Sequence, residues 1–120
     1  MDLVIKEIDS ELPGKLPLDG AEPFAVALRV EIGERDKPGA EVFHFIAVSP
    51  TGLQTELGDK GFNLMRGLIL MERFNLVTIH RAIGNLIHHT RSLEKWDDVV
   101  KFFNRYARYD SEDLDGELYP

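Results

Sequence analysis

The chain has 120 residues, which is enough material for one hydrophobic core, so we expect a single domain over residues 1–120. Its 14 lysines and arginines against 21 aspartates and glutamates give a net charge of −7, which disfavours direct binding to nucleic acid or anionic lipid and favours a basic protein partner. The chain has no cysteine, no signal-peptide pattern and no long apolar stretch, which excludes thiolate chemistry and predicts a cytoplasmic protein that does not span the membrane.

The first half of the chain predicts three strands. Residues 2–9 are rich in β-branched and apolar types, which favours a first strand, and the proline- and glycine-rich stretch 11–23 predicts a loop. From Phe24 to Ile32 the even positions are apolar, the period of a half-buried strand. Residues 41–48 predict its hairpin partner, and because that run is apolar on both faces we expect it to lie centrally in the sheet.

A short helix and a further strand are predicted next. Ser49 followed by Pro50 is typical of a helix start, because the hydroxyl accepts from an unpaired amide and proline fits the first helical position. We expect this helix to end near Leu57, before the two glycines at 58 and 61. The apolar run 65–72 is too short for a core helix and predicts a strand.

Two helices are predicted in the C-terminal third. Asn75 is a good N-cap for an amphipathic helix from Leu76, whose apolar residues recur at spacings of three and four. Ser92 is expected to cap a last helix that buries Trp96, Val99, Val100, Phe103 and Ala107 on one face. We therefore predict an α+β fold in which an antiparallel β-sheet of about four strands has helices packed over one face. Residues 1–109 would form the folded core and 110–120 an acidic C-terminal tail.

The sequence contains no recognisable catalytic or metal-binding motif. The four histidines, His44, His80, His88 and His89, do not follow a metal-ligand spacing, so we expect neither a metal site nor a cofactor. Adjacent acids such as Asp97 and Asp98 usually face water and suit the first turn of a helix. A metal-independent hydrolase using His80 or His88 remains an alternative, but we expect a protein that is not an enzyme.

Two features suggest a binding surface. Phe102 and Tyr109 fall outside the buried stripe predicted for the last helix, and aromatic residues often anchor protein interfaces. After Arg108 the chain carries Asp110, Glu112, Asp113, Asp115 and Glu117 and no basic residue. Such a tail either is simply solvated or replaces phosphate charge in the basic groove of a partner.

Several short motifs follow one another in a characteristic order. They are Phe43-His44-Phe45 leading into Ser49-Pro50-Thr51-Gly52-Leu53, the segment Arg66-Gly67-Leu68-Ile69-Leu70, and Trp96-Asp97-Asp98 followed by Tyr106, Tyr109 and Glu112-Asp113. Their order resembles the immunity protein 8 family of bacterial polymorphic toxin systems. The resemblance covers about residues 24–114. Two features depart from the family pattern: Gly52 stands where an aromatic residue is expected, and the tail lacks the expected tryptophan and closing tyrosine, unless Tyr119 serves as that tyrosine.

The resemblance implies an antidote that binds and neutralises a cognate toxin domain, often a nuclease, by stoichiometric occlusion. On that basis the expected partner-binding residues are Phe102, Tyr109, Glu112, Asp113 and Asp115. The alternative of a different class is a small regulatory or scaffold domain that acts through sheet-edge pairing or as a homodimer.

Overall fold

The computed structural model describes residues 1–12, 15–62 and 66–110. Its elements combine a mixed sheet with helices that all come after β3 in the chain. In chain order they are β1 (Leu3–Ser10), β2 (Ala25–Glu34), β3 (Glu41–Val48), α1 (Pro50–Leu57), the 3₁₀ turn η1 (Gly58–Lys60), β4 (Leu68–Leu70), α2 (Leu76–His89), α3 (Trp96–Phe103) and β5 (Arg108–Tyr109).

Strands β1, β2 and β3 form an antiparallel meander, and two short strands, β4 and β5, extend the sheet beyond β3. β1 pairs with β2 and β2 with β3, both antiparallel. The other edge of β3 is shared: its residues 46–48 pair in parallel with β4, and Phe43 and His44 pair antiparallel with β5. β3 is therefore central, as its apolar character on both faces predicts.

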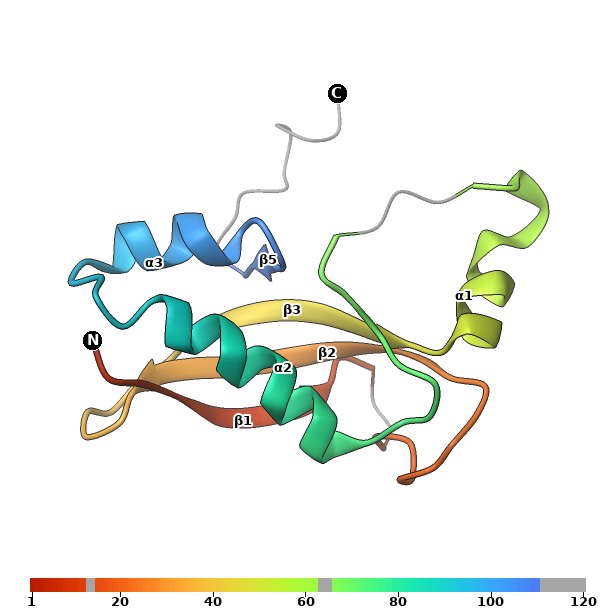
Figure 1. Cartoon of the computed structure of the whole chain (residues 1–120), viewed down its shortest axis with the longest axis horizontal. Helices are drawn as coiled ribbons and strands as arrows, with labels where there is room; N and C mark the ends of the chain where they lie inside the picture. The colour runs from red at the N-terminus through yellow and green to blue at the C-terminus, as the bar shows by residue number, and fades with distance from the viewer. Residues whose placement is uncertain (13–14, 63–65, 111–120) are drawn as a thin grey trace.

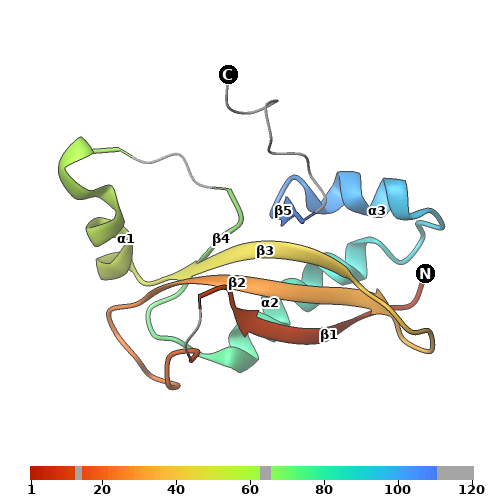
Figure 2. The same cartoon turned by 180° about the vertical axis from the view of Figure 1, so that it is seen from behind.

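Helices α2 and α3 lie on the same side of this sheet (Figure 1). The core fills the space between them and the sheet, and its largest fully buried side chains include Leu28, Ile32, Phe43, Phe74, Ile79, Ile83, Val99 and Phe103. In Figure 2 the strands lie in front of α2, and no described helix is laid across them. The predicted α+β fold, with helices over one face, is confirmed.

Local signals explain where the first two helices begin. The Ser49 hydroxyl accepts from the Gly52 amide at 2.9 Å, and it also accepts from Phe24 N–H at 3.1 Å, so one buried side chain caps α1 and ties it to the start of β2. Asn75 caps α2 through a bond from Thr78 N–H at 3.0 Å. α1 stands apart from α2 and α3, at the end of the sheet where β3 ends (Figure 1).

Three local expectations need correction. Ser92 does not cap the last helix: α3 starts after Lys95, which makes no side-chain capping bond, and it ends at Phe103 rather than continuing to Ala107. The strand predicted over 65–72 is shorter than expected: it covers only β4, and it runs parallel to β3. Met65, the first residue of the predicted strand, lies outside the described residues. β5 follows from no pattern in the sequence.

None of the helices in the described part of the chain is long and apolar enough to cross a membrane.

Candidate functional site

The side of the sheet opposite α2 and α3 carries a row of polar side chains. Register pairs Asp9 of β1 with Arg29 of β2, Arg29 with His44 of β3, and His44 with Arg108 of β5. Residues directly opposite each other point to the same face. The row therefore crosses four strands, in a protein whose other sheet face is filled with apolar side chains.

His44 is the centre of this row and is almost fully buried, with 10% of its side chain exposed. Its Nε2 lies 2.5 Å from Oδ1 of Asp110 in a hydrogen bond. Its Nδ1 lies 2.8 Å from Oε1 of Glu11, but off the direction that a hydrogen bond requires, so this buried nitrogen makes no hydrogen bond within the described residues. Two converging carboxylates repel each other unless a donor lies between them, and His44 occupies that position.

Carboxylates outnumber guanidinium groups around the row. Glu11 also lies 3.9 Å from Arg108, and Arg29 donates to Glu31 at 2.7 Å. That hydrogen bond, with further contributions from the charges of Asp110 and Glu7, raises the pKa of the Arg29 guanidinium above its usual value. We use the term acidic face for the carboxylates that flank the row, which are Glu7, Asp9, Glu11, Glu31 and Asp110.

Asp110 belongs to this surface rather than to a solvated tail. Its backbone N–H donates to the Val42 carbonyl at 2.9 Å, and its carboxylate meets His44. The acid-rich C-terminal segment therefore starts from the acidic face. The predicted partner-binding residues Glu112, Asp113 and Asp115 lie outside the described residues.

The two aromatic residues predicted to bind a partner occupy different environments. Phe102 is half-buried in an aromatic cluster, with ring centroids 5.5 Å from Tyr106 and 6.2 Å from His89. Tyr109 lies on the helix side of the sheet, where its ring centroid is 5.3 Å from that of Phe43. Phe102 and Tyr109 therefore pack against different aromatic rings, and their role in binding stays a prediction.

The other histidines lie apart from the acidic face. His80, His88 and His89 are exposed on α2. Within residues 1–12, 15–62 and 66–110, no three histidine, aspartate or glutamate side chains are arranged as metal ligands. Sequence reasoning missed His44 as a site residue, although a histidine on an otherwise apolar central strand was the available signal.

A comparison with protein-family models matches residues 4–114 to the model described as immunity protein 8. The match begins in β1, and so extends further toward the N-terminus than the resemblance predicted from residue 24. No curated protein and no solved structure matched the chain.

Proposed function

Because the chain belongs to the immunity protein 8 family, we propose that it neutralises its cognate toxin by binding it one to one and covering the toxin's active site or the path of its substrate. Family membership itself implies a toxin as partner. Immunity proteins are typically non-enzymatic inhibitors, which agrees with the expectation that this chain is not an enzyme. The proposed place of action is the cytoplasm of the cell that makes the toxin.

The acidic face is the observation that supports this mechanism most directly. It gathers five carboxylates on one side of the sheet, in a protein whose net charge is −7. A surface of one sign accelerates encounter with a partner of the opposite sign and disfavours partners of the same sign. The toxin that fits is therefore a basic domain.

A nuclease toxin is the proposed class. Nucleases bind phosphate with basic groups, and carboxylates at matching positions occupy those groups through charge-assisted hydrogen bonds. The acidic residues Glu112, Asp113 and Asp115 extend the chain from Asp110, which the structure holds on the acidic face. We propose that these residues contact the toxin, with Phe102 and Tyr109 as aromatic anchors.

Co-expression with the toxin domain encoded beside the chain tests the proposed function. We expect growth to be restored, and the two proteins to co-purify as a one-to-one complex at moderate salt. Toxin activity in vitro should fall to zero at one equivalent of the chain. A toxin that stays active in the presence of excess chain would refute the proposal.

Charge-reversed variants test the role of the acidic face. The double variant Glu7→Lys with Asp9→Lys should lower the association rate with the toxin about tenfold or more at low salt, and weaken its dependence on salt. Asp97→Lys with Asp98→Lys is the matched control, because it changes net charge equally on exposed residues of α3. Equal effects of the two variants would assign the steering to overall charge instead of the acidic face.

A further inference from the structure

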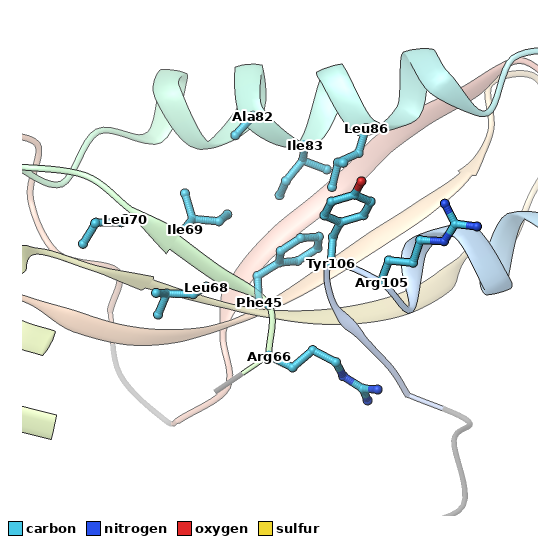
Figure 3. A pocket seen from close by; sticks show the side chains of 11 residues that line it. Phe45, Arg66, Leu68, Ile69, Leu70, Ala82, Ile83, Leu86, Arg105 and Tyr106 are labelled. Atoms are coloured by element: carbon cyan, nitrogen blue, oxygen red, sulfur yellow. The ribbon is translucent and has the colours of Figure 1, made fainter. Parts of the chain in front are cut away.

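An apolar groove opens on the helix side of the sheet, beside β4. Its volume is about 490 Å³, within the range of sites that bind ligands. Figure 3 shows Ile69 of β4 pointing toward α2, with Tyr106 and Phe45 beside it, and Ala82, Ile83 and Leu86 of α2 along the other wall. Tyr106 is 45% exposed, so part of the lining is a large aromatic surface in contact with solvent.

Some backbone N–H and C=O groups of β4, the strand that borders the groove, point away from β3. The Ile46 N–H donates to the Gly67 carbonyl, and the Met71 N–H donates to the Val48 carbonyl. Since alternate residues of a strand direct their backbone groups to opposite sides, the N–H and C=O groups of Leu68 and Leu70 point away from β3. The Leu68 and Leu70 side chains are 39% and 56% exposed. An apolar edge strand of this kind favours pairing with another chain.

The charged residues that line the groove are both arginines. Arg66 precedes β4 and Arg105 follows α3, and Figure 3 shows both at the end of the groove away from Leu70. The Arg105 guanidinium also lies 6.0 Å from the centre of the Phe102 ring. The net charge of the chain is −7, but the charge at this end of the groove is positive. It therefore favours a carboxylate group of a bound partner.

The groove and the acidic face meet the same edge of β3. β4 borders the groove and β5 carries the chain to Asp110, and both strands pair with that one edge. A single partner that approaches this edge therefore reaches Asp110 and the groove together.

We propose that β4 accepts an extended segment of the toxin as an added strand, which places one bulky apolar side chain in the groove and a neighbouring carboxylate beside Arg105. This inference rests on the proposed function, since the partner is the same toxin domain. Main-chain hydrogen bonds to β4 supply affinity in this mode, and the groove and its arginines supply specificity.

The role of the groove is tested by measuring, with titration calorimetry, the Kd for the toxin domain that is encoded beside the chain. Ala82→Trp fills the groove and should raise Kd about 30-fold or more, as expected for loss of a central anchor. Val77→Trp is the control, because Val77 is 64% exposed on the same helix and does not line the groove. Thermal unfolding followed by circular dichroism checks that both variants fold.

Two further variants test the other parts of the proposal. Arg105→Glu should raise Kd about tenfold, whereas Arg81→Glu, an equal charge change at an exposed residue of α2 outside the groove, should leave Kd within about twofold. Leu70→Pro removes an N–H that points away from β3, so it should weaken binding more than Leu70→Ala does.

The outcomes separate this inference from the proposed function. If the unmodified chain binds the toxin and Ala82→Trp binds as tightly as Val77→Trp, the groove proposal is wrong and the proposed function stands. If the unmodified chain does not bind the toxin, both are wrong. If light scattering shows the chain alone to be a dimer that Ala82→Trp converts to a monomer, the occupant is a second copy and the toxin segment is ruled out.

Discussion

The contact between His44 and Asp110 should stabilise the fold measurably, because it fastens the start of the C-terminal segment to the sheet. Hydrogen bonds to charged groups contribute about 1.5–3 kcal/mol when buried, and exposed ion pairs contribute about 0–1 kcal/mol. The side chain of His44 is 10% exposed and that of Asp110 is 54% exposed, with 2.5 Å between Nε2 and Oδ1. We therefore expect a coupling free energy of about 1–1.5 kcal/mol between the two side chains.

A double-mutant cycle in urea measures that coupling. The free energy of unfolding is determined for His44→Ala, Asp110→Ala and the double variant, and the coupling is the departure from additivity. The same cycle with His80→Ala in place of His44→Ala is the control, because His80 is exposed on α2 and has no contact with Asp110 among those described. A His44 coupling no larger than that of the control would refute the view that His44 holds Asp110 on the sheet.

Three other substitutions have expected effects on the free energy of unfolding, each measured by urea denaturation. Phe103→Ala should lower it by about 3–5 kcal/mol, because the ring is fully buried and its centroid lies 4.8 Å from that of Phe43; a loss below about 1 kcal/mol would contradict this packing. Ser49→Ala should cost about 2 kcal/mol, since it removes the cap of α1 and the acceptor for Phe24 N–H, and Ser10→Ala on β1 should be nearly neutral by comparison. Gly67→Ala should cost about 1–3 kcal/mol, because φ is +84° and the added Cβ would lie 2.9 Å from the His44 carbonyl oxygen; an unchanged midpoint would show that the backbone relaxes there without cost.

The fold was predictable where local patterns and tertiary packing agree. The period of two in β2, the Ser49 and Asn75 caps and the apolar stripe of α2 each depend on residues close together in the sequence, and each was predicted within a few residues. The parallel direction of β4 was not predictable in the same way. Periodicity reports which face a residue occupies but carries no information on the direction of its neighbour.

The site was less predictable than the fold, for a related reason. His44 acquires its role from Glu11 and Asp110, which are distant in the sequence and meet only when β1, β3 and β5 are assembled. β5 itself is two residues long and too short for any alternation to be visible. The shift of Asp110 from a predicted tail to the acidic face follows from that short pairing.

The shared edge of β3 has a consequence for the order in which the molecule assembles. β2 and β3 are joined by a short hairpin connection, whereas β4 and β5 pair with β3 only after long stretches of chain have closed into loops. Closing each loop costs conformational entropy, and only two or three paired residues offset that cost. The meander should therefore form first, and this edge should close last. In amide hydrogen exchange the same edge would open most readily, so β4, the strand proposed to pair with a partner, would also belong to the part of the sheet that changes conformation most easily.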